Sequence, residues 1–407
     1  MIHSTTLKNG FTVISEPQPW QPSVSFDLLI PAGAVNEPET MRGVTSVLED
    51  WMDRGAGNRD SRALSDAFDN LGVRRGGGAG LEGTSFSGAM LETDLTAAFE
   101  LFADVIQRPS LPDTELEPCL ELARQDIESL DDSPAQKMFV KLRERFFSSN
   151  HGRSGMGTLE GLAAITGVAA RADYQNRFTP NGAILGVSGG VKWDELLELV
   201  TRLFGSWTGQ PASNPTPIMK GGFYDHIVQD TAQVQIGMLY PSLAPTDPHW
   251  LESRLALLVL SGAGFSSRLM QEVREKRGLV YSVRASGSPI QSASTISVYA
   301  GTSPDRAQET LNVIQEEMQK IRLGVTLEEL ERARIGLLTS LVMSEESSGA
   351  RAGGLVRDWH LLGRARELED LKAKVKAVTL EGVNVWLAAN PFENPGVMTL
   401  GPKALNL

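Results

Sequence analysis

Apolar positions along this chain follow two patterns, one typical of strands and one typical of helices. Short runs with period-2 alternation and many β-branched residues predict strands. Longer runs with apolar residues three and four apart predict helices. Strand-like runs lie at 11–16, 23–30 and 84–91, and helix-like runs lie at 43–52, 64–71, 95–107, 116–130, 135–147 and 250–261. This arrangement predicts an α+β sandwich, a mostly antiparallel sheet with helices packed on one face.

The pattern occurs twice. Residues 23–38 (SVSFDLLIPAGAVNEP) and 233–248 (QVQIGMLYPSLAPTDP) align without a gap, which places Pro31 opposite Pro241. Each segment reads as an apolar strand that ends in a proline-bounded loop, and each then leads into a helix-like run, at 43–52 and at 250–261. Such self-similarity indicates an internal duplication rather than a solenoid.

A linker divides the two copies near mid-chain. Residues 210–222 (QPASNPTPIMKGG) hold three prolines, two glycines and little apolar pattern. We therefore expect an N-terminal domain at 1–209, a linker at 210–222 and a homologous C-terminal domain at 223–407. The chain is long enough for two such domains.

The charge and cysteine content of the chain limit which partners and bonds are expected. The formal net charge of −12 argues against nucleic acid or an anionic membrane surface. The single cysteine, Cys119, excludes an intrachain disulfide, and a small core residue is the simplest interpretation of it. The sequence shows no signal-peptide pattern and no apolar run approaching the roughly 18–20 residues that span a bilayer. We expect a cytoplasmic protein.

A glycine-rich stretch follows the helix-like run at 64–71. Residues 76–80 (GGGAG) lack the Lys-Ser/Thr and the helix start that a phosphate-binding loop requires. We interpret the stretch as a connector that enters an edge strand, with a substrate-facing loop as the alternative.

The chain resembles the inverzincin peptidases, the group that contains pitrilysin, insulin-degrading enzyme and the mitochondrial processing peptidase. The resemblance covers nearly the whole chain. The most specific segment is 266–283 (SSRLMQEVREKRGLVYSV), and further matching segments are 7–13 (LKNGFTV), 33–50, 71–72 and 131–134 (DDSP). It implies two duplicated domains that form half of a clamshell.

The resemblance also implies where a metal site would lie. The family motif His-x-x-Glu-His puts two imidazoles one turn apart on a helix, beside a general-base glutamate. Its two histidines fall on Ser46 and Asp50, its glutamate falls on Glu49, and the third ligand falls on Asp126. None of the three metal ligands of the family is therefore present as such.

The chemistry of these replacements disfavours zinc, which prefers imidazole and thiolate. A hard cation such as calcium on Glu49, Asp50 and Asp126 would lack the usual carbonyl-rich loop. We expect no metal in this chain, and we interpret Glu49 as an exposed or paired helix carboxylate. The chain has five histidines, and none lies near these positions in sequence: His3, His151, His226, His249 and His360.

The second catalytic feature of the family is an arginine and a tyrosine seven residues apart, which match Arg274 and Tyr281. Residues 266–277 are expected to be helical, with Ser266 or Ser267 as N-cap, and Gly278 is expected to end the helix. The alternative is an arginine paired with Glu272 or Glu275 and a tyrosine packed on the sheet. The residues 261–265 (SGAGF) resemble a shortened form of the glycine-rich loop of the processing peptidase's non-zinc subunit.

The resemblance therefore implies a non-catalytic subunit of a heterodimeric zinc metalloendopeptidase. A homologous partner with intact His-x-x-Glu-His would hold the zinc and cleave unfolded peptides, and Arg274 and Tyr281 would act in trans. Two alternatives stay open. One is a scaffold subunit resembling the respiratory-chain core proteins, and the other is a homodimeric peptide-binding chamber without chemistry.

Overall fold

The computed structural model describes residues 1–210, 214–262, 264–390 and 392–407. They form two compact units that interleave along the chain. Unit 1 comprises Met1–Ser129, Arg153–Pro215 and Ser344–Glu367, and unit 2 comprises Leu130–Gly152, Thr216–Met343 and Leu368–Leu407. The expected linker at 210–222 includes residues 211–213, which lie outside the described residues.

Unit 1 contains a six-stranded sheet in the order β1-β2-β8-β3-β7-β6. Its strands are β1 (His3–Thr6), β2 (Thr12–Pro17), β3 (Ser23–Ile30), β6 (Arg74–Ala79), β7 (Thr84–Leu91) and β8 (Ile184–Gly189), and a separate short pair is β4 (Gly55–Ala56) with β5 (Arg59–Asp60). Its helices are α1 (Val44–Met52), α2 (Ser61–Asn70), α3 (Leu95–Gln107), α4 (Asp113–Glu128), α6 (Leu159–Ala163), α7 (Gly167–Arg177), α8 (Trp193–Phe204) and α12 (Ser348–Leu362).

Unit 2 contains a five-stranded sheet in the order β11-β12-β10-β13-β9. Its strands are β9 (Phe223–Val228), β10 (Val234–Ser242), β11 (Val280–Ile290), β12 (Ala293–Thr302) and β13 (Gly396–Gly401). Its helices are α5 (Pro134–Phe146), α9 (Trp250–Ser261), α10 (Ala307–Lys320), α11 (Leu327–Glu345), α13 (Leu368–Ala377) and α14 (Leu380–Ala389).

The two sheets share one topology. In unit 1, β2 and β8 run parallel while the other neighbouring pairs are antiparallel. In unit 2, β9 and β13 form the one parallel pair among the described strands, in the corresponding place. Strand β3 corresponds to β10, and these two strands lie at the start of the two sequence segments that align. The mostly antiparallel α+β architecture and its duplication are therefore confirmed.

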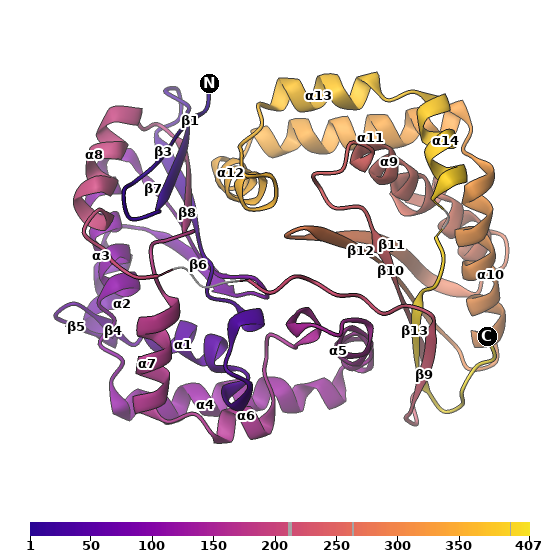
Figure 1. Cartoon of the computed structure of the whole chain (residues 1–407), viewed down its shortest axis with the longest axis horizontal. Coiled ribbons are helices and arrows are strands. Elements are labelled where there is room, and N and C mark those ends of the chain that lie inside the picture. Colours follow the sequence, from indigo (N-terminus) through magenta and orange to yellow (C-terminus); the bar gives the residue numbers. More distant parts are fainter. Residues whose placement is uncertain (211–213, 263, 391) are drawn as a thin grey trace. The chain divides into compact units, whose positions relative to one another are not determined.

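Each sheet carries one helix from the other half of the chain. Helix α12 follows the strands of unit 2 in sequence but packs on β8, β3 and β2 of unit 1. Helix α5 precedes the expected linker but packs on β13 and β10 of unit 2 (Figure 1). The units therefore differ from the expected division at 209 and 223, because these two helices are exchanged between the halves.

Glycines in the central strands allow the exchanged helices to come close. A Cβ at Gly186 of β8 would lie 2.6 Å from the Ala352 carbonyl oxygen of α12. A Cβ at Gly237 of β10 would lie 2.4 Å from the Met138 methyl carbon of α5. Helices therefore cover both faces of the central strands, one face by a layer of several helices and the other by a single exchanged helix.

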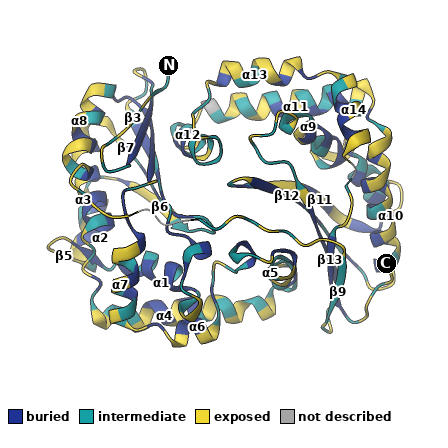
Figure 2. Ribbon diagram, in the orientation of Figure 1, coloured by how far each residue is buried: buried dark blue, intermediate teal, exposed yellow. Residues whose placement is uncertain are grey.

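Burial follows the predicted periodicities. Buried residues line the helix faces that meet the sheets, while exposed residues form their outer faces (Figure 2). Every residue of β8 is buried, as expected for a strand covered on both faces. The bounds of β3, β7, α3 and α9 coincide with the strand-like or helix-like runs of the sequence.

Candidate functional site

Helix α1 carries the three positions that match the family's metal motif, and a buried carboxylate fixes its start. The Gly43 backbone N–H donates to Glu37 Oε2 at 2.9 Å, and the Thr45 N–H donates to Glu37 Oε1 at 2.8 Å. Gly43 adopts a φ of +104°, in the left-handed region that favours glycine. Glu37 thus satisfies two of the free N–H groups of the helix.

The motif positions share the partly exposed side of α1. Ser46, Glu49 and Asp50 are three and four residues apart, so their side chains lie on one helix face. The opposite side anchors the helix in the core of unit 1 through Val44, Val47, Leu48, Trp51 and Met52. Helix α1 therefore presents a hydroxyl and two carboxylates on its partly exposed side, and no imidazole.

Asp50 already has a cationic partner. Both of its carboxylate oxygens lie 3.0 Å from the Arg54 guanidinium, one turn along α1. Cys119 of α4 also contacts this carboxylate, and it is buried as the sequence predicted. The pKa of the Cys119 thiol is raised to about 12, chiefly by burial and also by its hydrogen bond to Asp50. Neither contact was predicted from the sequence, although the i,i+4 spacing from Asp50 to Arg54 indicates the ion pair.

Glu49 stands in an unfavourable electrostatic environment. Its pKa is raised to about 7, chiefly by burial and also by the negative charges of Asp53 and Asp50. Among the described residues, the Glu49 carboxylate has no side-chain hydrogen bond or ion pair. Glu49 is half-buried, which differs from the expected exposed or paired carboxylate.

Asp126 lies on α4 and is exposed. It is seven residues after Cys119, so both lie on the same face of that helix. Across the described ranges, no group of three His, Cys, Asp or Glu side chains is placed to hold a metal ion. A serine hydroxyl, an arginine-bound aspartate and an exposed aspartate do not fit zinc, which binds imidazole and thiolate in tight tetrahedra.

The arginine and tyrosine positions lie in unit 2, where a π-helical segment precedes β11. This segment spans Met270–Glu275, and the Lys276 N–H donates to the Gln271 carbonyl five residues back at 3.0 Å. The sequence predicted an ordinary α-helix here, and the structure instead has the wider π-helical turn. Its buried side rests on Leu269 and Val273, and Gly278, with a φ of +62°, ends it as expected. Wide turns of this kind are frequent at functional sites.

Ser267 lies at the expected start of the helix but does not cap it with its side chain. Its carbonyl accepts the Gln271 N–H at 2.9 Å, while its hydroxyl donates to the Gly264 carbonyl at 2.9 Å. The loop that it closes, 261–265, includes residue 263, which lies outside the described residues.

Arg274 and Tyr281 come together. The Arg274 guanidinium carbon lies 5.0 Å from the centre of the Tyr281 ring and 4.9 Å from the centre of the Phe265 ring. The Tyr281 side chain is 83% exposed, so it is not packed on the sheet. Two aromatic rings therefore hold an accessible cation by cation–π contacts. No spacing in the sequence indicated the part played by Phe265.

The two glutamates near Arg274 pair with different cations. Glu272 binds Lys276 and Arg277, and the hydrogen bonds from these cations lower its pKa. Arg274 has Glu275 at 3.5 Å, both partly exposed. The expected alternative is therefore present for Arg274 through Glu275, but not for Tyr281. A partly exposed ion pair of this kind contributes little to stability.

The glycine-rich stretch forms part of edge strand β6 itself. Residues 76–79 pair with β7, and Gly80 closes the turn toward β7 through a hydrogen bond to the Gly83 carbonyl at 2.9 Å. Arg75 on this strand reaches Asp53 at 3.4 Å and lies over the Phe68 ring at 4.4 Å. The edge strand thus runs close to helix α1, with its outer backbone groups available for pairing.

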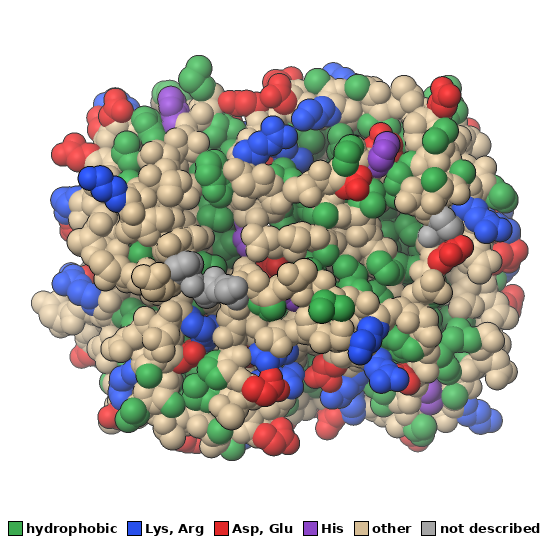
Figure 3. All heavy atoms as spheres, in the orientation of Figure 1, with side chains coloured by type: hydrophobic (Ala, Val, Ile, Leu, Met, Phe, Trp, Pro, Cys, Tyr) green, Lys and Arg blue, Asp and Glu red, His purple; other side chains and the backbone are tan. Residues whose placement is uncertain are grey.

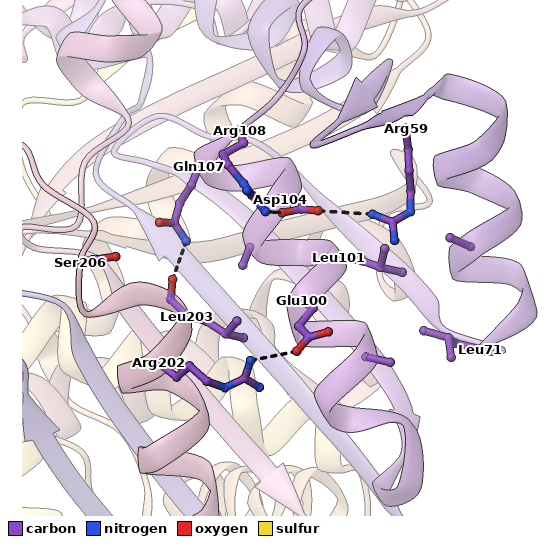
Figure 4. Close-up of a pocket in the computed structure, with 13 residues that line it drawn as sticks. Arg59, Leu71, Glu100, Leu101, Asp104, Gln107, Arg108, Arg202, Leu203 and Ser206 are labelled. Carbon is purple, nitrogen blue, oxygen red and sulfur yellow. Dashed lines mark hydrogen bonds and ion pairs between the residues drawn. The ribbon is translucent and has the colours of Figure 1, made fainter.

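A cavity of about 650 Å³ in unit 1 lies outside this set of residues (Figure 4). Asp104 binds both Arg59 and Arg108, and Glu100 binds Arg202 at 2.9 Å. Its charged groups are thus paired with one another between α3, β5 and α8. The polar groups of this cavity therefore form a network of ion pairs at the surface of unit 1.

The surface carries both signs of charge. Acidic and basic side chains are interspersed over the visible face (Figure 3). No helix among the described residues is long and apolar enough to cross a membrane.

Comparison with known proteins links both halves to one family. The insulinase (peptidase family M16) model matches residues 12–158, and the model described as the peptidase M16 inactive domain matches residues 165–337. An uncharacterized zinc protease of Mycobacterium leprae is 29% identical, with 98% of this chain and 92% of that protein covered. The uncharacterized zinc protease YmxG of Bacillus subtilis is 26% identical, with 94% of each covered.

Two solved structures share the fold. A peptidase M16 inactive domain from Pseudomonas fluorescens superposes with a TM-score of 0.92 at 21% identity, covering 100% of this chain and 99% of that one. A protease from Helicobacter pylori superposes with a TM-score of 0.87 at 20% identity, covering 99% of this chain and 100% of that one.

Proposed function

The chain belongs to peptidase family M16, and on this premise we propose that it is the non-catalytic subunit of a heterodimeric zinc metalloendopeptidase. A homologous companion with intact His-x-x-Glu-His would carry the zinc and cleave unfolded peptides within a closed chamber. This chain would supply Arg274 and Tyr281 to that site in trans.

One combination of features supports the proposal. The helix that would bind metal has Ser46 and Asp50 in place of imidazoles, and Asp50 is held by Arg54. The arginine–tyrosine pair, in contrast, is present, assembled and accessible. A chain without any peptidase role would not need an exposed tyrosine stacked on a partly exposed arginine, because such a contact adds little to stability.

The donor chemistry of the pair suits peptide hydrolysis. Arg274 offers a permanent forked cation, and Tyr281 offers a neutral hydroxyl donor. Together they can hold the carbonyl oxygen of a peptide bond and stabilise the negative charge that grows on it as water attacks. The rings of Phe265 and Tyr281 fix the guanidinium in place, so little reorganisation is needed when that charge appears.

The test is reconstitution of cleavage. The purified chain is mixed with a homologous His-x-x-Glu-His subunit from the same organism, and cleavage of an unfolded fluorogenic peptide is followed. We expect neither subunit alone to cleave and the mixture to cleave. Arg274→Ala should lower kcat of the mixture about 10²- to 10³-fold, the usual cost of removing one oxyanion donor. Tyr281→Phe should lower kcat in the same direction.

Matched controls separate a catalytic effect from a structural one. Arg332→Ala removes a partly exposed arginine of α11, and Tyr224→Phe removes a hydroxyl that bonds Thr399 at 2.9 Å. Both should leave kcat unchanged in complexes of the same stoichiometry. Full activity of the Arg274→Ala and Tyr281→Phe mixtures would refute the role of the pair. A complex of two copies of this chain without a zinc-bearing companion would favour the homodimeric chamber instead.

A further inference from the structure

A cavity in unit 2 lies next to the arginine–tyrosine pair, because Phe265 belongs to both. It measures about 630 Å³, within the range of ligand pockets. Helix α5, the loop before the π-helical segment and strands β11 and β12 form its walls. We call it the Arg284 pocket and use six of its lining residues: Phe139, Phe265, Met270, Arg284, Ser286 and Ser297.

Strand alternation explains why this side of the sheet is polar. Val283 and Ala285 of β11 are buried in the core of unit 2, so Arg284 and Ser286 point to the other face. Helix α5 covers the central strands on that face, and its Phe139 ring reaches Tyr299 of β12 at 5.8 Å. Beyond α5, the edge of the sheet stays open as the pocket.

The pocket combines an apolar part with one cation. Phe139, Phe265 and Met270 supply the apolar wall, while the Ser286 and Ser297 hydroxyls bond each other at 3.0 Å. Within the described part of the chain, no acidic side chain lines the cavity and Arg284 forms no ion pair. This local positive charge stands out in a chain of net charge −12.

Phe265 connects the pocket to the arginine–tyrosine pair. Its ring lines the pocket and also lies 4.9 Å from the Arg274 guanidinium carbon. In an extended peptide, side chains on the same face repeat every second residue, about 6–7 Å apart. A peptide whose carbonyl meets Arg274 therefore places a nearby side chain at the entrance of the pocket.

We propose that the Arg284 pocket receives an acidic side chain of the peptide substrate and thereby sets sequence preference. A glutamate fits this chemistry, because its methylene stem packs against the apolar wall and its carboxylate pairs with the guanidinium. The inference rests on the proposed peptide-handling function and names the substrate class within it.

The experiment measures binding to the isolated full-length chain, so that no companion subunit is needed. The probes are three fluorescein-labelled ten-residue peptides that differ at one central position, Glu, Gln or Lys, and have no other charged side chain. Fluorescence anisotropy gives the three dissociation constants. We expect the Glu peptide to bind about tenfold more tightly than the Gln peptide, as for a hydrogen bond to a charged group.

Charge reversal provides the decisive comparison. Arg284→Glu should invert the order, so that the Lys peptide binds most tightly, and Arg284→Gln should abolish the difference between the Glu and Gln peptides. The matched control is Arg364→Glu in unit 1, another exposed arginine without an ion pair in the described ranges, which should keep the wild-type order. Thermal unfolding of each variant checks that it folds.

Two outcomes overturn the inference: equal binding of the Glu and Gln peptides to the wild-type chain, or an unchanged order in Arg284→Glu. If binding behaves as expected while the mixed subunits fail to cleave, the pocket stands and the subunit role falls. If the mixture cleaves without any Glu preference in binding, the subunit role stands and the pocket falls.

Discussion

Replacing Glu49 by glutamine should stabilise the protein, and more so as the pH rises. In the folded chain, burial and the charges of Asp53 and Asp50 raise the pKa of Glu49 to about 7 from its ordinary 4.5. Glutamine keeps the shape of the side chain and removes the charge. The variant therefore isolates the cost of holding a carboxylate in this place.

The sign follows from proton uptake. Between pH 4.5 and 7 the folded state holds more protons on Glu49 than the unfolded state does, so the stability of the wild type falls as the pH rises through this window. A shift of this size corresponds to a loss of about 1 kcal/mol at pH 5, about 2 kcal/mol at pH 6 and about 3 kcal/mol at pH 8, relative to the protonated side chain. Because Glu49 is half-buried, these values are upper bounds.

The assay is urea unfolding of wild type and Glu49→Gln at pH 5, 6, 7 and 8, followed by tryptophan fluorescence. The difference in unfolding free energy between the two proteins should grow with pH and level off above pH 7. Asp53 and Glu37 also have raised pKa values caused chiefly by burial, but they are present in both proteins. Glu128→Gln, at an exposed position of α4, is the matched control and should give a flat difference.

A pH-independent difference between wild type and Glu49→Gln would refute this reasoning. So would a variant that is less stable than wild type at pH 8, because that result would mean that the ionised carboxylate has a stabilising partner. Such a partner would be a cation, and the interpretation of α1 as a helix without metal would then have to be revised.

Two other changes test the packing of unit 1 by the same urea assay. Arg351→Ala should lower the free energy of unfolding by about 3–5 kcal/mol, because the Glu16 carboxylate, only 15% exposed, loses the guanidinium that joins α12 to β2. Glu16→Gln combined with Arg351→Met should recover much of this loss. A double variant in which the two losses simply add would contradict the argument. Gly43→Ala should cost more than the roughly 1–2 kcal/mol of a left-handed alanine, because its Cβ would lie 2.9 Å from Leu162. Gly72→Ala, with a φ of +61° and no atom within 4 Å, should cost only that amount.

The sequence predicted those elements in which periodicity and burial agree. Strands β3 and β7 alternate clearly, and α3 and α9 have long apolar stripes, so their bounds could be predicted to the residue. An amphipathic pattern says that a helix has a buried face but not which sheet that face meets. The exchange of α5 and α12 therefore lay beyond the pattern, although the glycines at 186 and 237 mark the strands that the two helices approach.

In the candidate site, too, the sequence predicted local elements but not tertiary contacts. The spacing of Arg274 and Tyr281, with a glycine between a helix and a strand, is compatible with the contact that the two side chains make. Local pattern favoured an α-helix at 266–277, because Leu269 and Val273 suit an ordinary turn, and it carried no sign of the π-helical geometry. Phe265 and Arg284 belong to the site only through tertiary contacts, which the order of residues does not reveal.

The two motif regions differ in what surrounds their charges, and this difference bears on function. In unit 1, Arg54 pairs with Asp50, and burial together with the charges of nearby acids raises the pKa of Glu49, as expected for a carboxylate that no cation balances. In unit 2, Arg274 is held between two aromatic rings and Arg284 has no acidic partner among the described residues. The cation of the first motif region is thus used within its own helix, whereas unit 2 presents Arg284 without an acidic partner among the described residues and Arg274 with only the partly exposed Glu275. Groups left in that state are suited to a ligand, and a peptide with its carbonyl oxygens and acidic side chains supplies the matching acceptors.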